Sequence, residues 1–112
     1  MAYDRELATR IEALLQPTGT VEPKRMFGGV GFMVDGHLAM CVMSDGRILA
    51  RVGLDADRGL ARPGVEPMVM GGRSMSGWLA VDGALVEDDD ALGEWIARCV
   101  GFVRSGVLPK RV

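Results

Sequence analysis

The first residues of the chain carry apolar side chains at the period of an α-helix. The repeat runs i, i+4, i+7 and i+8, on Leu7, Ile11, Leu14 and Leu15. Residues so spaced share one helix face. Asp4 is placed to cap the first turn, and Pro17 and Gly19 stop the pattern. The sequence therefore predicts an amphipathic helix over residues 4–16.

Three extended apolar segments follow, at 25–34, 37–44 and 47–52. They are separated by Asp35-Gly36 and Asp45-Gly46. Asp-Gly between apolar runs favours a two-residue hairpin, because a type I′ turn needs positive φ at both central residues. The pattern predicts a three-stranded antiparallel meander.

The second half of the chain predicts a short helix, two strands and a long helix. The short helix spans 55–61, before Arg62-Pro63-Gly64, and the strands span 67–71 and 76–82. The long helix begins near Asp88–Asp90 and carries the apolar stripe Leu92, Trp95, Ile96, Cys99, Phe102 and Val103. The predicted fold is α+β, in the order α-β-β-β-α-β-β-α, within a single domain over residues 1–112.

Strand alternation assigns the meander side chains to two faces, provided that both Asp-Gly pairs are two-residue turns. The predicted core face holds Val30, Phe32, Ala39, Cys41, Met43, Ile48, Ala50 and Val52. The second face holds Gly29, Gly31, Met33, Leu38, Met40, Val42 and Leu49, with Arg47 and Arg51 toward its edge. An antiparallel sheet with one solvated face would show polar residues there.

Because the first and last helices can cover only one face, we expect another subunit to cover the second. The seven second-face residues are therefore the interface candidates of a predicted homodimer. Gly29 and Gly31 would form a shallow strip open to close approach, and Met40 would give adaptable apolar contact. Two other interpretations are a β-bulge or bend, and a phosphate-binding loop. The loop is disfavoured because the glycines lead into a strand and not into a helix.

Composition narrows the possible functions. The chain has 112 residues, 25% charged and 48% hydrophobic, and a net charge of −2, so no overall basic field favours direct nucleic-acid binding. No apolar run is long enough to span a membrane and the N-terminus is not a signal peptide, so we expect a cytoplasmic protein. Cys41 and Cys99 fall within apolar patterns and are predicted to be buried free thiols.

The sequence contains no recognisable catalytic or metal-binding constellation. His37 is the sole histidine, and four strand residues separate it from Cys41 by roughly 13 Å, too far to share a metal ion. The acidic run 87–90 is typical of a helix start. We expect no catalytic residue, cofactor or metal, and hence no enzyme. Arg25, Arg51 and Arg73 either edge a pocket for a small molecule or nucleotide or are scattered surface charges.

Several short motifs at fixed separations resemble a known family. They are Lys24-Arg25-Met26-Phe27-Gly28-Gly29, Arg62-Pro63-Gly64, Gly72-Arg73 and Gly77-Trp78. Together with the opening helix they resemble the TfoX N-terminal domain family (TfoX/Sxy-like) over residues 3–110. The resemblance implies an α-β3-α-β2-α fold similar to type III secretion chaperones. Because the chain ends where that shared domain ends, we expect a stand-alone single-domain member.

The same resemblance implies a regulatory role. Full-length members include regulators of natural competence that work with a cyclic-AMP receptor protein, and it implies no catalytic residue. We therefore expect a non-enzymatic protein-interaction domain, a homodimer that serves as an accessory factor in transcriptional regulation and whose further partner is a transcription regulator. The alternative is a small-molecule or nucleotide-sensing domain that uses the arginine-edged pocket.

Overall fold

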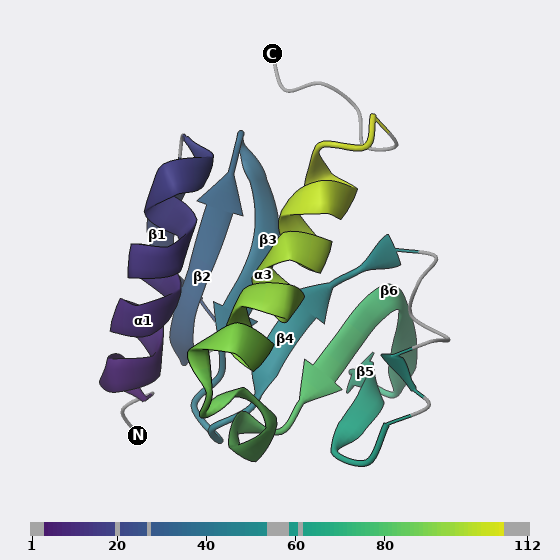
Figure 1. Cartoon of the computed structure of the whole chain (residues 1–112). Coiled ribbons are helices and arrows are strands. Elements are labelled where there is room, and N and C mark those ends of the chain that lie inside the picture. The colour runs from purple at the N-terminus through teal and green to yellow at the C-terminus, as the bar shows by residue number, and fades with distance from the viewer. Residues whose placement is uncertain (1–3, 20, 27, 54–58, 61, 107–112) are drawn as a thin grey trace.

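The computed structural model describes residues 4–19, 21–26, 28–53, 59–60 and 62–106. One six-stranded sheet forms a layer, and helices α1 (Arg5–Leu15) and α3 (Asp89–Val103) lie together on one side of it (Figure 1). Short 3-10 segments, η1 (Gln16–Thr18) and η3 (Gly83–Val86), adjoin the two helices. The α+β class predicted from the sequence is confirmed.

Both long helices begin where the sequence predicts, with aspartate caps. The Asp4 carboxylate accepts a hydrogen bond from the Leu7 amide at 3.0 Å, and the Asp88 carboxylate accepts one from the Asp90 amide at 3.2 Å. Such caps satisfy amides that have no partner within the helix. The predicted short helix at 55–61 lies mostly outside the described residues.

All strand pairs are antiparallel, in the order β1-β2-β3-β4-β6-β5. The strands are β1 Val21–Met26, β2 Gly29–Val34, β3 His37–Val42, β4 Ile48–Arg51, β5 Val65–Met70 and β6 Arg73–Val81. The sequence predicted five strands. The predicted strand 25–34 is in fact the end of β1 and the whole of β2, which reverse direction around Gly28 at φ 73°.

Two local features shift the meander register by one residue from the prediction. Asp35-Gly36 does form a two-residue turn, with φ of 52° and 85°, but Phe32 then pairs with Met40, so that Ala39 is an extra residue in a bulge. The second turn is longer than predicted. The Met43 amide donates to the Arg47 carbonyl at 2.9 Å, leaving the three-residue loop 44–46.

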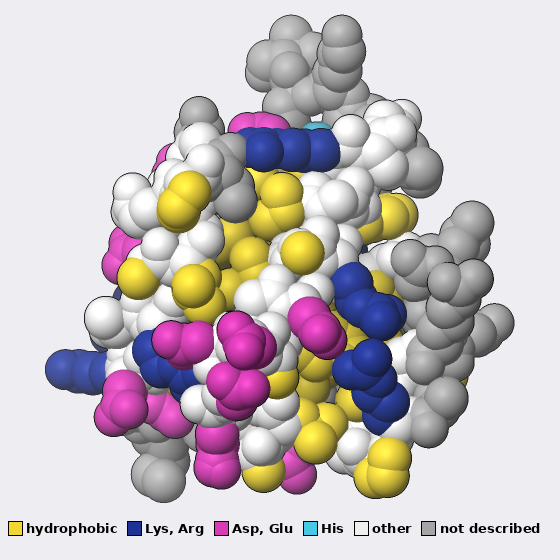
Figure 2. Space-filling view, viewed as in Figure 1, with side chains coloured by type: hydrophobic (Ala, Val, Ile, Leu, Met, Phe, Trp, Pro, Cys, Tyr) yellow, Lys and Arg dark blue, Asp and Glu magenta, His cyan; other side chains and the backbone are white. Residues whose placement is uncertain are grey.

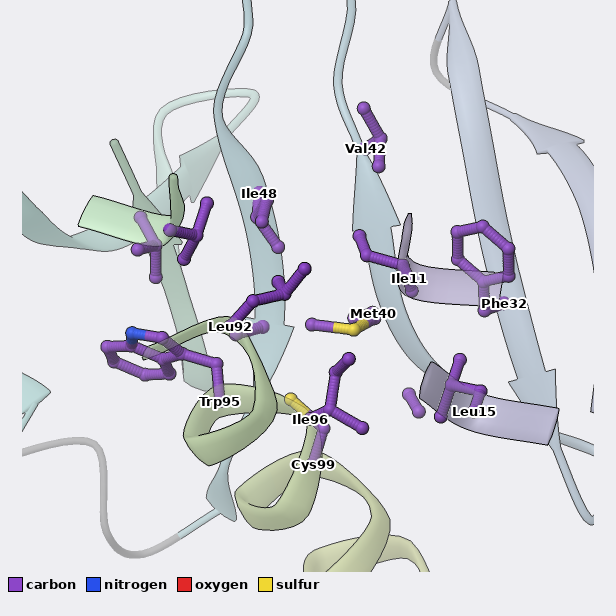
Figure 3. Packing of buried hydrophobic residues seen from close by; sticks show 14 of the residues in the cluster. Ile11, Leu15, Phe32, Met40, Val42, Ile48, Leu92, Trp95, Ile96 and Cys99 are labelled. Atoms are coloured by element: carbon purple, nitrogen blue, oxygen red, sulfur yellow. The ribbon is translucent and has the colours of Figure 1, made fainter. Parts of the chain in front are cut away.

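This shift reverses several predicted faces, because a one-residue slip turns each side chain to the opposite side. Met40 and Val42 face the helices and are completely buried with Phe32, so their predicted place on the second face is wrong. Figure 3 shows Met40 among Ile11, Leu15 and Ile96, with Phe32 and Val42 nearer Ile11. Cys41 and Met43 lie on the second face, opposite to the prediction. Ile48 and Ala50 are in the main core, as predicted.

Candidate interaction surface

The sheet face opposite α1 and α3 carries a second apolar cluster. Its floor is buried and consists of Cys41, Leu49, Met68 and Ala80. Half-buried Met26, Met43, Met75 and Trp78 pack against the floor. By strand alternation, half-buried Met33 and Leu38 lie on the same side of the sheet. We call these ten residues the methionine face. Five of the eight methionines in the chain belong to it.

Strand register places these side chains together. Cys41 pairs with Leu49, and Leu49 pairs in turn with Ala80 across β4 and β6. Met33 pairs with Leu38 nearer the β2–β3 turn. The covering side chains are long and unbranched apart from Leu38 and Trp78, and methionine adapts readily to irregular apolar surfaces.

The two candidate glycines do not form an open strip. A Cβ at Gly29 would overlap the backbone carbonyl oxygen of Val42, so glycine is required there for β2 and β3 to approach. At Gly31 a Cβ would lie 2.7 Å from both Leu38 Cδ1 and Met26 Sδ. The predicted shallow strip is therefore wrong, because neighbouring strands and side chains already occupy that space.

The seven interface candidates thus occupy three different environments. Met33 and Leu38 are half-buried on the methionine face; Leu49, Gly29 and Gly31 are buried; Met40 and Val42 lie in the main core. The sequence pattern assigned Cys41 and Met43 to the opposite face and did not assign Met26, Met68, Met75, Trp78 or Ala80 to either face. Alternation within 73–81 would have placed Trp78 with Ala80, but nothing in the sequence marks β1 as a separate strand.

The three candidate arginines do not edge a common pocket. Arg25 is exposed on β1 and pairs with Val30, which faces the helices. Arg51 lies three strands away, opposite Trp78. Arg73 is exposed at the β5–β6 turn, five residues from Trp78 and so roughly 17 Å along the strand.

The Arg51 side chain is held in place by contacts with two aromatic rings and a backbone carbonyl. Its guanidinium carbon lies 5.0 Å from the Trp78 ring centroid and 5.7 Å from that of Phe102, and Nη1 donates to the Leu38 carbonyl at 3.3 Å. Partial burial lowers the pKa of Arg51 by desolvation. Arg51 therefore packs at the edge of the methionine face. The three candidate arginines do not form the predicted pocket.

Both edges of the sheet are protected against pairing with another strand. Edge strands β1 and β5 each begin with Val-Glu-Pro, at residues 21–23 and 65–67. Proline has no amide to donate, and exposed charges discourage strand addition. Association through the sheet edges is therefore disfavoured, whereas the methionine face lacks such protection.

The thiols are free and buried, as predicted. Burial raises the pKa of the Cys41 thiol to about 11 and that of the Cys99 thiol to about 12. Neither is ionised near neutral pH, which makes them poor nucleophiles. Among the described residues no group of three or more His, Cys, Asp or Glu side chains could hold a metal ion, and no helix is long and apolar enough to cross a bilayer.

A two-layer α+β domain with helices on one sheet face and methionines on the other is the class that these features define. Residues 13–103 match the model of the TfoX N-terminal domain, and the chain belongs to that family. The family is linked to the regulation of competence. A comparison with curated proteins finds no significant match.

Proposed function

We propose that this protein is a non-enzymatic, cytoplasmic interaction domain that forms a homodimer through the methionine face and acts as an accessory factor in transcriptional regulation. The observation that carries the proposal is an apolar sheet face on the side away from α1 and α3. Soluble homo-oligomers most often have two-fold symmetry, in which one surface patch contacts itself. Membership of a family linked to competence regulation supports the regulatory part.

The chemistry of the face supports self-association through side chains. Two copies stacked face to face would place methionines against methionines and Trp78 against an apolar surface, and such aromatic anchors contribute strongly at interfaces. The proline-containing edges favour stacked sheets over one continuous sheet. Arg51 would lie at the rim, where interfaces are polar.

The experiment is sedimentation of the purified protein over a range of concentrations, with Met75→Lys and Met43→Lys as interface variants. A dimer has about twice the 12.0 kDa mass of the chain. Both methionines are half-buried on this face, so a buried lysine in the dimer would cost several-fold to a hundredfold in association.

Leu85→Lys is the matched control, because Leu85 is an exposed leucine of η3 and lies outside the methionine face. It should leave the association constant unchanged. A particle of 12.0 kDa at high micromolar concentration, or Met variants that associate as tightly as the unmodified protein, would contradict the proposal.

A further inference from the structure

On the helix side of the molecule, two arginine side chains contact the ring of one tryptophan. The Trp95 side chain on α3 is buried, with 3% of the residue exposed. The Arg62 guanidinium carbon lies 5.7 Å from its ring centroid, and that of Arg98 lies 5.5 Å away. Arg98 follows Trp95 by three residues on the same helix, whereas Arg62 comes from the segment before β5. The aromatic ring thus holds two cations from distant parts of the chain.

Neither cation is neutralised within the described part of the chain. Arg10, Arg47 and Arg104 each form an ion pair with an aspartate, at 2.7–2.8 Å. Arg62 and Arg98 form no ion pair or hydrogen bond with any described residue, although Glu94 precedes Arg98 by one helical turn. Each guanidinium therefore keeps donors available for an anionic group.

Two exposed leucines lie near the segment that carries Arg62. Leu60 is 38% exposed and Leu85 is 37% exposed. The chain before Leu60 approaches the tryptophan, since a Cβ at Gly59 would lie 3.6 Å from the ring. The chain after Arg62 approaches Leu85, since a Cβ at Gly64 would lie 2.9 Å from its Cδ1. We call Leu60, Arg62, Leu85, Trp95 and Arg98 the Trp95 patch.

We propose that the Trp95 patch binds an acidic, partly apolar segment of a partner protein. Each guanidinium presents parallel donors that fit a carboxylate bidentately, and the exposed leucines offer apolar contact nearby. Arginines next to exposed aliphatic side chains are typical of interaction surfaces, and the buried Trp95 ring helps to hold the two guanidiniums in place. This patch and the methionine face lie on opposite sides of the sheet, so either proposal can fail alone.

The surroundings favour a protein segment over nucleic acid. A nucleic-acid strand needs a basic stripe that follows several phosphates, whereas the patch offers two cations. In Figure 2 two groups of basic side chains lie on the right, and acidic side chains lie across the centre and lower left of the same face. The acidic residues 87–90 at the start of α3 would repel a continuing phosphate backbone but tolerate the short contact of a peptide.

The test is an NMR titration of the isotope-labelled protein with a short peptide rich in aspartate and leucine. The same peptide with every aspartate replaced by asparagine is the ligand control. A single-stranded oligonucleotide, titrated separately, tests the alternative that the patch binds nucleic acid. We expect the peptide to shift the Trp95 indole signal and the Nε signals of Arg62 and Arg98. Asparagine should abolish the shifts, and added salt should weaken binding.

The variant Arg62→Gln/Arg98→Gln should weaken peptide binding by about tenfold or more, because it removes both charge-assisted contacts. Arg25→Gln/Arg73→Gln, which removes two exposed arginines elsewhere, should not change it. Arg62→Lys/Arg98→Lys keeps the charge without the planar fork and should bind with intermediate affinity. The proposal is overturned if the aspartate peptide gives no shift at these signals, if the glutamine variant binds equally well, or if only the oligonucleotide binds there.

Discussion

At the residue scale, two glycines differ in whether the surrounding structure leaves room for a side chain. Gly29 is required by the backbone of β3, because a methyl group there would overlap the Val42 carbonyl oxygen. Gly93 lies within α3, and a Cβ there would meet nothing within 4 Å. The first position needs glycine, whereas the second has only the entropic cost of a glycine in a helix.

Substitution by alanine should therefore have opposite signs at these two positions. Gly29→Ala should lower the free energy of unfolding by about 3 kcal/mol or more, since backbone must move to make room. Gly93→Ala should raise it by about 0.5–1 kcal/mol. Urea denaturation followed by circular dichroism measures both. Equal tolerance at the two positions would contradict the close approach of β2 and β3.

The buried thiols give a pH dependence with a definite sign. The ordinary thiol pKa is 9.0, and folding raises that of Cys41 to about 11 and that of Cys99 to about 12. Above pH 9 the unfolded chain gains from ionising thiols that the folded protein keeps neutral. The stability that the neutral thiols contribute is therefore fully present below pH 9 and is lost as the pH rises from 9 through the folded pKa values of about 11 and about 12.

Denaturation between pH 8 and 11 should show stability falling more steeply for the unmodified protein than for Cys41→Ala/Cys99→Ala. At pH 8 a thiol reagent should label neither cysteine until denaturant is added. Rapid labelling of the native protein would show that one thiol is accessible, which would contradict its burial.

At the element scale, Arg10 fastens α1 to the start of α3. Its guanidinium donates to the Asp89 carboxylate at 2.7 Å and to the carbonyls of Val86 and Glu87 at 2.9 and 3.1 Å. Arg10→Ala should reduce the unfolding free energy by about 1–3 kcal/mol, because several charge-assisted hydrogen bonds are lost together. Arg10→Lys should restore only part of it.

The control for this contact is Arg47→Ala. Arg47 pairs with Asp45 within an exposed loop, and such surface pairs contribute little, on the order of 0–1 kcal/mol. Thermal or urea unfolding should separate the two alanine variants clearly. If both cost the same small amount, Arg10 does not fasten the helices.

The same elements show what the sequence could predict. The apolar spacing of Leu7, Ile11 and Leu15 and the aspartate at position 88 predicted both long helices, because helix periodicity and caps are local signals. Strand β1 was hidden, because Val-Glu-Pro-Lys-Arg lacks the apolar alternation of a half-buried strand and suits an edge.

Register was the weaker part of the prediction. Whether Asp45-Gly46 closes a two-residue or a three-residue loop, and whether Ala39 bulges, depends on packing between distant residues and not on the turn residues alone. The second face is nevertheless apolar, as predicted, although several of its side chains are different residues from those predicted, most of them methionines. The arginine pair at Trp95 joins positions 36 residues apart and had no local signal.

At the scale of the whole molecule, the two sheet faces are closed to different degrees. α1 and α3 cover one face of the sheet and complete the main hydrophobic core. On the methionine face, no helix in the described part of the chain covers the buried residues, and only half-buried side chains of the strands pack over them. With the sheet edges protected by Pro23 and Pro67, this face is the surface through which we expect two copies to associate.

The most direct measurement is an isotope-filtered NOE experiment on a mixture of labelled and unlabelled protein, with methionine methyl groups as reporters. We expect NOEs between copies from the methyls of Met26, Met43 or Met75 to Trp78 of the other copy, and none from Met40, which lies in the main core. NOEs between copies that arise only from residues of α1 or α3, or a complete absence of such NOEs at millimolar concentration, would contradict this expectation.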